Sequence, residues 1–493
     1  MSWHIVHWDE EKVRQSLKRG RYDDVSVTGW GRLDDMVALS HELGIYREFE
    51  GLESKLKGEG YIPSWFMNMA LLFRSYVGDE SLNSMQKSLF RNRGILRMLG
   101  VNAIEMQEGF DRARNNGENK PCHVDSLRYH VQGISGEDYY DSFRRIGGRV
   151  VEEGLIKKGG MWILDATKIE VEGEYSGMGV IEEVIETLDN QGRHHRRVEV
   201  HKGFKWVTLC YLFPGSKWLF VMSYRLLGLK EHEITVSDEL IEEILGSYGK
   251  GFIGELYIDR GFLDGERIYR WHKGHGIEVT VPLKSNMDML KDMQGLSKLS
   301  DDESKVTAQR NGEKDSQGKH LEDVKVIGFS GLTSLDSYPG ELNGLLLEEY
   351  RGKKIPLEKQ WGFLTTKPLR DHEEVLGAYD GYDDRSLIEN RAYRESKQGY
   401  KINRFIGKDE SSIAGHIFFE TLAYNMVGVY RQEGSEKLID LGIRRLRREV
   451  FGGEPELIVV FEDSFAIFEL LEFLELLGRS PTHALDHVRL KFL

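Results

Sequence analysis

Three carboxylates carry the chemistry that this sequence favours most. Asp165 follows the apolar run from Met161 to Leu164, Asp259 ends the short strand-like segment ELYID, and Glu389 lies in a basic helical stretch much later. Mg2+ and Mn2+ prefer hard oxygen ligands, and two such ions can hold both the attacking and the leaving oxygen of a phosphoryl transfer. We therefore expect the three side chains to meet in a site for two divalent metal ions.

Each carboxylate taken alone has a plainer explanation, because an acid at the end of a strand is more often a turn or capping residue. The three acids are also separated by 94 and 130 positions in the chain. The combination favours a site, since two acids end strands, where open α/β sheets place their sites, and the third lies beside basic residues. A glycosidase could also use a pair of carboxylates, but it would leave those basic residues unexplained.

The stretch 382–404, which contains the third acid, is predicted to be one helix. Asp383 and Asp384 stand where a helix N-terminus favours negative charge, and neither Pro nor Gly interrupts the stretch before Gly399. The elements that position the acids therefore include two strands and this helix.

One face of the predicted helix is basic. At about 100° per residue, Tyr382, Arg385 and Glu389 fall within one narrow face. From Arg385 to Arg404 there are six Lys or Arg against two Glu, a local charge of +4 in a chain of net charge −14. Such a face suits contacts with phosphates, and a solvated amphipathic helix is the alternative.

Strand and helix signals alternate from Gly159 onward. An apolar run at 159–173 is followed by FKWVTLCYLF and WLFVMSYRLL, which the turn PGS at 214–216 joins into a β-hairpin. The next segments are a helix near Ser237, then strand, helix and strand at 255–262, 264–273 and 277–284. This order is typical of an α/β domain with a mixed sheet.

The rest of the chain is predicted to form separate parts. The N-terminal part is helical, and its basic corner at Arg91, Arg93 and Arg97 suits a DNA-contacting bundle and equally any helical domain. The expected domains are a helical, DNA-end-binding domain at 1–155, a catalytic core at 156–284 and 361–432, an inserted β-containing domain at 285–360, and a helical C-terminal tail at 433–493.

Composition describes a folded protein with a sizeable core, at 40% hydrophobic and 11% aromatic residues. No apolar run reaches the length of a membrane span, and MSWHIVHWDEEKVRQ does not look like a signal peptide. Cys122 and Cys210 are the only cysteines, so the expected compartment is a reducing cytoplasm. The net charge of −14 argues against general affinity for nucleic acid, so DNA contacts would have to come from local patches.

Several motifs together resemble the DDE transposases of bacterial and archaeal insertion sequences. They are LDATKIE, YIDRGF, Y-x-x-R-x-x-x-E, RESKQG and HIFFETLAYNM, and they extend from about Trp162 to Tyr430. The resemblance implies an RNase H-like fold, which is an α/β mixed sheet flanked by helices, with a β-rich insertion before the helix that carries the Glu. The helical N-terminal domain is in keeping with it.

The resemblance also implies roles for individual residues. Asp165, Asp259 and Glu389 resemble a metal-binding triad for Mg2+ or Mn2+. Tyr382, Arg385, Glu389 and Lys397 resemble a tyrosine–arginine–glutamate–lysine signature that contacts DNA phosphates. The usual lysine follows the glutamate by seven residues, where this chain has Ser396, and Lys397 comes one residue later. The further DNA-binding candidates on the same basic stretch are Arg394 and Lys401.

The activity implied is metal-dependent cleavage of double-stranded DNA at transposon ends, followed by attack of the freed 3′-OH on target DNA. Pairing of two ends implies a dimer on DNA, and a prokaryotic, nucleoid-associated protein is expected. A nuclease of the same fold that joins no strands, and a DNA-binding relative without catalysis, are the alternatives.

Overall fold

The computed structural model describes residues 10–56, 61–110, 121–188, 194–299, 304–312, 322–434, 438, 440–453, 455–461 and 464–476. The chain forms two compact units, one made of Met1–Arg149 with Glu395–Leu493 and the other of Val150–Arg394. This division differs from the expected linear order of domains, because the chain leaves the first unit at Arg149 and returns to it at Glu395.

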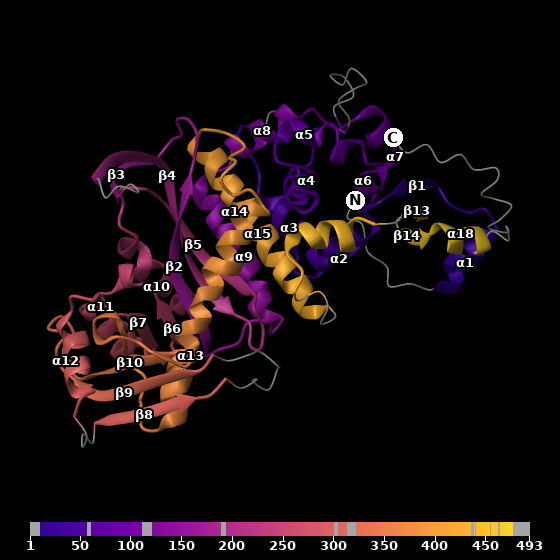
Figure 1. The fold of residues 1–493 in the computed structure, drawn as a ribbon. Helices are drawn as coiled ribbons and strands as arrows, with labels where there is room; N and C mark the ends of the chain where they lie inside the picture. Colours follow the sequence, from indigo (N-terminus) through magenta and orange to yellow (C-terminus); the bar gives the residue numbers. More distant parts are fainter. Residues whose placement is uncertain are drawn as a thin grey trace. The chain divides into compact units, whose positions relative to one another are not determined.

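A large mixed sheet is the centre of the second unit (Figure 1). Its order is β3-β4-β2-β6-β7-β12-β10-β9-β8, with β5 paired to β4 and β11 to β10. β6 pairs in parallel with β2 and β7, and the other neighbours pair antiparallel. The strands are β2 (Gly160–Glu170), β3 (Gly179–Leu188), β4 (His194–Leu212), β5 (Leu219–Gly228), β6 (Ile253–Ile258), β7 (Glu278–Pro282), β8 (Lys305–Arg310), β9 (Val324–Leu332), β10 (Leu342–Tyr350), β11 (Lys353–Lys354) and β12 (Trp361–Thr365).

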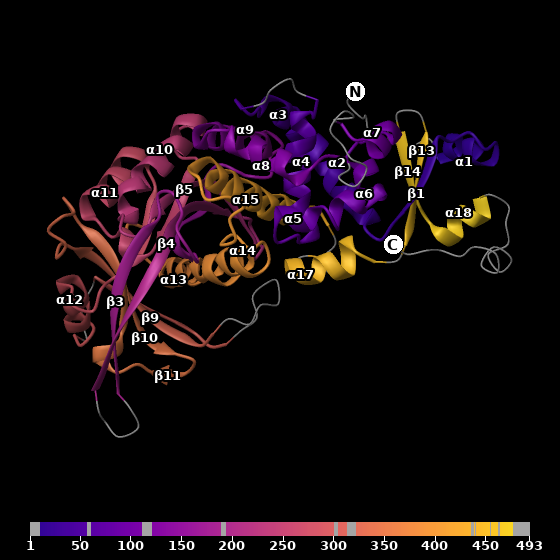
Figure 2. The same ribbon diagram turned by 90° about the horizontal axis from the view of Figure 1, so that it is seen from above.

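Helices flank this sheet, as predicted for an α/β fold. Figure 2 shows α10 and α11 on one side of the strands and α13 on the other. The predicted hairpin is present, since Leu212 pairs with Leu219 across the turn between β4 and β5. The helical segments of this unit are η3 (Glu233–Val236), α10 (Ser237–Tyr248), η4 (Arg260–Phe262), α11 (Gly265–Tyr269), the π-helix Arg270–Gly274, α12 (Asp288–Leu296), η6 (Leu357–Lys359), α13 (His372–Leu387) and the π-helix Ile388–Tyr393.

The strands of the predicted insertion extend the central sheet and do not form a layer of their own. β12 pairs with β7 on one edge and with β10 on the other. β10, β9 and β8 therefore continue the same sheet. Buried side chains of these strands, among them Val326 and Leu345, form one core cluster with Val375, Ala378 and Tyr379 of α13. The insertion therefore supports the helix that leads to Glu389.

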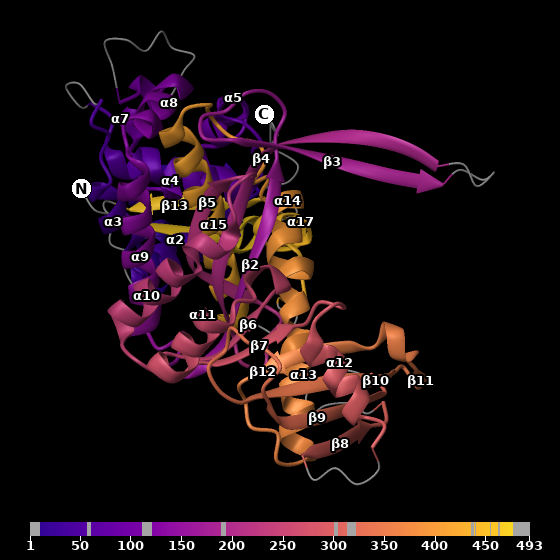
Figure 3. The same cartoon turned by 90° about the vertical axis from the view of Figure 1, so that its left-hand side faces the viewer.

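β3 and the first part of β4 form a two-stranded ribbon that projects beyond the rest of the sheet (Figure 3). Val184 pairs with Val198, and these side chains are 44% and 52% exposed.

The helix of the signature begins ten residues earlier than predicted. It starts at His372, where the Asp371 side chain accepts a hydrogen bond of 2.9 Å from the Glu374 amide. Asp383 and Asp384 therefore lie inside α13 and do not mark its start, because the better N-cap is an acid that the prediction overlooked.

The first unit is mainly helical. Its long helix α15 packs against α2, α4 and α8. Inside this unit Arg74 pairs with Glu420 and Arg431 with Glu395, and all four are almost fully buried. The helices are α1 (Glu10–Lys18), η1 (Gly31–Leu33), α2 (Asp34–Glu42), α3 (Ile45–Gly51), α4 (Ser64–Val77), α5 (Leu82–Met85), η2 (Leu89–Arg91), α6 (Arg93–Met98), α7 (Ala103–Glu108), α8 (Val124–Gln132), α9 (Gly136–Glu152), α14 (Arg394–Gln398), α15 (Glu410–Glu433), α17 (Ile443–Leu446), the π-helix Arg447–Phe451 and α18 (Leu470–Leu476).

The prediction of a wholly helical C-terminal tail is wrong. β13 (Glu456–Phe461) and β14 (Ser464–Glu469) form an antiparallel sheet with β1 (Asp24–Thr28). A short apolar run fits either a strand or a buried helix, and here a strand more than 400 positions earlier decides the outcome. Residues 477–493 of the predicted tail lie outside the described part.

The same sheet explains the basic corner of the N-terminal domain. Arg97 is 3% exposed and donates two hydrogen bonds to Asp24 Oδ2, from Nε at 3.0 Å and from Nη2 at 2.6 Å. It also donates to the Val101 carbonyl. Arg97 therefore ties α6 to β1 and is not placed to contact DNA, whereas Arg91 and Arg93 are exposed at least in part.

Candidate active site

The structure brings the three predicted carboxylates together around one nitrogen atom. Arg385 Nη2 lies 2.8 Å from Asp165 Oδ2, 3.4 Å from Asp259 Oδ1 and 3.6 Å from Glu389 Oε1. All four residues belong to the unit Val150–Arg394. Side chains that span 225 positions of the chain therefore converge on one point.

Asp165 is the buried member of the set, at 4% exposed. It lies in the middle of β2 and not at a strand end as predicted, because β2 continues beside the long β4 as far as Glu170. Its Oδ1 accepts a hydrogen bond of 2.8 Å from the Ala166 amide. Burial raises the pKa of Asp165 to about 7, although Arg385 and the Ala166 amide both favour its charged form.

The side chains of the other two carboxylates are more exposed to solvent than that of Asp165. Asp259 follows β6 directly, in extended backbone before η4, and its side chain is 36% exposed. Glu389 lies in the π-helix after α13, and its side chain is 65% exposed. The site is therefore closed at Asp165 and open at Glu389, so an external group would approach from the side of Glu389.

The guanidinium of Arg385 also contacts the aromatic side chain of Tyr382. Its Cζ lies 5.8 Å from the ring centroid of Tyr382, and Nη1 lies 3.4 Å from the Tyr382 hydroxyl. Tyr382 packs in turn on Phe363 of β12, with ring centroids 4.6 Å apart. Burial alone would lower the pKa of Arg385, but Asp165, Tyr382 and the other two acids outweigh it and raise this pKa. The guanidinium stays charged and serves as the local counterion of the three acids.

A tyrosine that the sequence did not single out for a role anchors the helix turn beside Glu389. Tyr393 is 4% exposed, and its hydroxyl lies 2.9 Å from Thr208 Oγ1. Thr208 of β4 pairs with Asp165 of β2. Trp206 of the same strand packs on Tyr393, with ring centroids 5.6 Å apart. No sequence signal could have shown this contact, because it depends on how the π-helix packs against β4, whose Thr208 lies 185 positions earlier in the chain.

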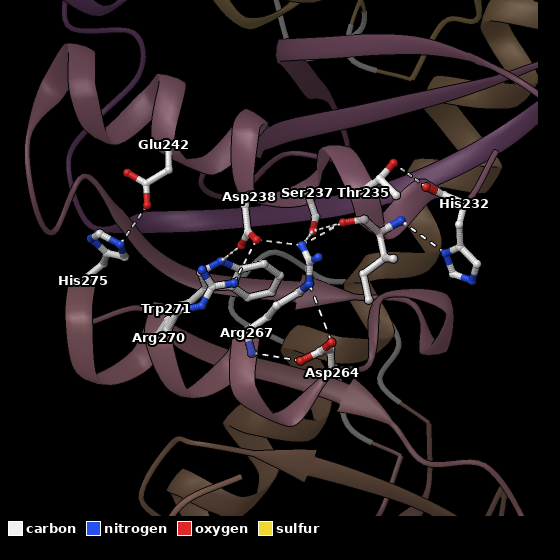
Figure 4. A network of polar contacts seen from close by, with 11 residues as sticks. His232, Thr235, Ser237, Asp238, Glu242, Asp264, Arg267, Arg270, Trp271 and His275 are labelled. Carbon is white, nitrogen blue, oxygen red and sulfur yellow. Dashed lines mark hydrogen bonds and ion pairs between the residues drawn. The ribbon is translucent and has the colours of Figure 1, made fainter. Parts of the chain in front are cut away.

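A second network that the sequence did not reveal fixes the segment after Asp259 (Figure 4). Asp238 accepts hydrogen bonds from Arg267 at 2.7 Å, from Arg270 at 2.9 Å and from Trp271 Nε1 at 2.9 Å. Arg267 Nη1 also donates to the Ile234 carbonyl at 2.9 Å. These bonds join the start of α10 to α11 and to the π-helix after it. They therefore hold in place the chain that follows the loop with Asp259.

Residues 159–426 match the family model of the transposase DDE domain. The match covers more than half of the 493 residues. The chain belongs to the DDE transposases. The activity of this family is DNA cleavage in transposition, a nucleotidyl-transfer reaction, and its domains generally use divalent metal ions. No relative among curated proteins matches the chain. Among the residues that the structure of the transposase describes, none of the helices combines the length and the apolar character of a membrane span.

The donor set of the transposase suits a divalent metal ion. Three carboxylates and one guanidinium leave a net charge of −2 if all are ionised, and carboxylate oxygens are the ligands that Mg2+ prefers. Within the described ranges, however, no group of three or more His, Cys, Asp or Glu side chains is arranged to hold a metal ion. Mg2+ usually binds one or two carboxylates together with substrate phosphates, so the residues fit an ion whose ligand set DNA would complete.

The predicted DNA-contact residues beyond the site differ in exposure. Ser396, at the usual position of the lysine, is 1% exposed, whereas Lys397 is half-buried and Arg394 is exposed. Lys401 Nζ lies 3.7 Å from Glu80 Oε1, and the backbone of Lys401 has a φ of 60°. Lys401 is therefore already in an ion pair.

Trp361 is the first residue of β12 and lies at the surface of the protein. Its side chain is 61% exposed, although Phe363, two residues later on the same strand face, is buried. The aromatic surface of Trp361 is therefore open to a ligand.

Proposed function

We propose that this transposase cuts DNA at the ends of a prokaryotic insertion sequence and joins the freed 3′ ends to target DNA. The observation that carries the proposal is the convergence of Asp165, Asp259 and Glu389 on one nitrogen of Arg385. The antiparallel strands β5, β4 and β2, followed by the parallel β6 and β7, support an RNase H-like core. The helical N-terminal residues would bind the transposon ends, and a dimer would hold two ends together.

In this proposal Asp165, Asp259 and Glu389 would hold two Mg2+ or Mn2+ ions. Such ions, when bound, activate the attacking oxygen and stabilise the leaving oxygen. Asp165 fixes the buried end of the site, and Asp259 and Glu389 present their carboxylates at its open side. Arg385 keeps the three acids together before DNA arrives, and Tyr382 restrains the guanidinium by packing on it. Trp361 would stack on a base displaced from the DNA end.

The test of the proposed function is an assay on the element's own DNA. The plasmid substrate carries the sequences that flank the gene, and purified protein is added with Mg2+ or Mn2+. We expect nicks at both junctions of the element, followed by products in which a freed 3′ end is joined to another DNA. Nicks without joined products would favour a nuclease, and no nicks with intact binding would favour an inactive relative.

The π-helix after α13 supports Lys397 as the lysine of the signature. A π-helical turn contains one residue more than an α-helical path needs, so it acts as a one-residue bulge. Glu389 lies inside this π-helix, and Lys397 follows it by eight residues and not seven. The bulge would offset the extra residue, and Ser396 at the usual position is too buried to reach DNA.

Lys397→Ala is expected to reduce the salt dependence of DNA-end binding. Each neutralised phosphate contributes a slope of about −0.9 to the plot of log K against log salt concentration. The slope of the variant should therefore be less steep by about one unit, which binding titrations at several salt concentrations would measure. Ser396→Ala is the matched control and should leave the slope unchanged. An effect of Lys401→Ala in place of Lys397→Ala would reassign the contact.

A further inference from the structure

Helix α13 and strand β6 touch at a glycine. Gly381 lies one residue before Tyr382, and a Cβ atom at this position would overlap the hydroxyl oxygen and Cζ of Tyr257 and lie 2.9 Å from its Cε1. Real Cβ atoms keep larger distances from neighbouring atoms. Only glycine therefore allows the helix to lie at its present distance from the strand.

The Tyr257 ring cannot easily move away from the helix. It is 1% exposed, and its hydroxyl donates a hydrogen bond of 2.8 Å to Glu255 Oε2. Lys367 Nζ lies 2.9 Å from Glu255 Oε1 and 3.4 Å from the same hydroxyl. A side chain added at Gly381 would therefore displace the helix and not the ring.

The contact joins the two elements that carry the site. Tyr257 precedes Asp259 by two residues, so both side chains leave the same face of the chain at the end of β6. Gly381 precedes Arg385 by four residues, about one turn of α13. A change in the distance between Gly381 and Tyr257 would therefore change the 3.4 Å distance between Arg385 Nη2 and Asp259 Oδ1.

We propose that Gly381 and Tyr257 are a positioning pair that sets the distance between the strand of Asp259 and the helix of Arg385 and Glu389. The proposal rests on the proposed function of the triad. Neither residue touches the reacting atoms, since both act through the elements that present the acids. A displacement of about 1 Å at a reaction site can lower a rate by about 100-fold.

The chain offers a matched pair of substitutions that tests this proposal. Gly377 lies in the same helix one turn before Gly381, and a Cβ added there would meet no atom within 4 Å. Gly377→Ala should leave the nicking rate unchanged and raise the melting temperature, because Ala is the better helix former. Gly381→Ala should lower the single-turnover nicking rate about 100-fold, with unchanged affinity for the plasmid ends that carry the flanking sequence.

A second substitution separates positioning from general loss of structure. Tyr257→Leu removes the hydroxyl oxygen and the two ring carbons that come closest to the added Cβ. Gly381→Ala combined with Tyr257→Leu should therefore nick faster than Gly381→Ala alone. The melting temperature of each variant shows whether it is folded. The proposal is overturned if folded Gly381→Ala nicks as fast as Gly377→Ala, or if Tyr257→Leu slows Gly381→Ala further. A wild-type protein that nicks no DNA would contradict the proposed function instead.

Discussion

Asp165→Asn is expected to abolish DNA nicking while leaving DNA-end binding almost intact. The substitution keeps the shape of the side chain but removes the charge, and the same holds for Asp259→Asn and Glu389→Gln. Loss of one ligand from a metal-assisted phosphoryl transfer should lower the rate at least about 1,000-fold, which corresponds to about 4 kcal/mol of transition-state stabilisation. The measurement is the single-turnover nicking rate at saturating Mg2+, together with a binding titration.

Asp383→Asn is the matched control for these substitutions. Asp383 is an exposed acid on α13 outside the set of side chains around Arg385, and it undergoes the same chemical change. Its nicking rate should stay within about twofold of wild type, because surface substitutions away from a site have small effects. If nicking survives in all three triad variants, these acids are not the catalytic set.

Arg385→Ala is expected to destabilise the metal-free protein by about 3 kcal/mol at pH 8. Arg385 and Asp165 form a buried pair, with side chains 11% and 6% exposed, so removal of the arginine leaves a buried carboxylate without its counterion. Removing one partner of such a pair costs more than the pair itself contributes, because the remaining charge stays desolvated.

The pH dependence of this loss distinguishes it from a simple loss of packing. The folded pKa of Asp165, about 7, lies above the ordinary value of 3.8, so its contribution to stability falls as pH rises from about 4 to about 7. Without Arg385 this pKa should rise further, and stability should continue to fall above pH 7. The difference between variant and wild type should therefore be small at pH 5 and large at pH 8.

Urea unfolding at both pH values in the presence of a chelator measures the effect, and Arg394→Ala is the control. Arg394 is an exposed arginine that follows the π-helix directly. Its removal should change stability by less than about 0.5 kcal/mol at either pH. An equal loss for Arg385→Ala at pH 5 and pH 8 would mean that the arginine contributes packing and not charge compensation.

The strands around the site were predictable from the sequence, because their signals are local. The apolar run before Asp165, the two segments that the PGS turn joins and the short segment before Asp259 all correspond to strands of the structure. What the sequence could not show is the register between them. The contact of Tyr393 with Thr208 and the space for Gly381 against Tyr257 depend on neighbours more than 100 positions away.

The differences in the rest of the chain have the same origin. Asp371 caps α13, which starts ten residues before the predicted start, and the prediction followed the acids nearest to the signature. β13 and β14 were taken for a helix because their apolar runs are short, and their partner β1 lies at the other end of the chain. Local pattern therefore identified the elements near the triad, whereas long-range pairing decided those at the termini.

The interrupted path of the chain through its first unit affects the order in which the protein can fold during synthesis. The part Met1–Arg149 is made first, but α15, which packs against α4 and α8, belongs to the part that begins at Glu395. At about 5–20 residues per second, the ribosome needs on the order of 10 to 50 seconds to make the intervening segment. During this time the apolar surfaces of α4 and α8 that α15 will cover stay exposed on the nascent chain. The segment Val150–Arg394 can already fold as a unit.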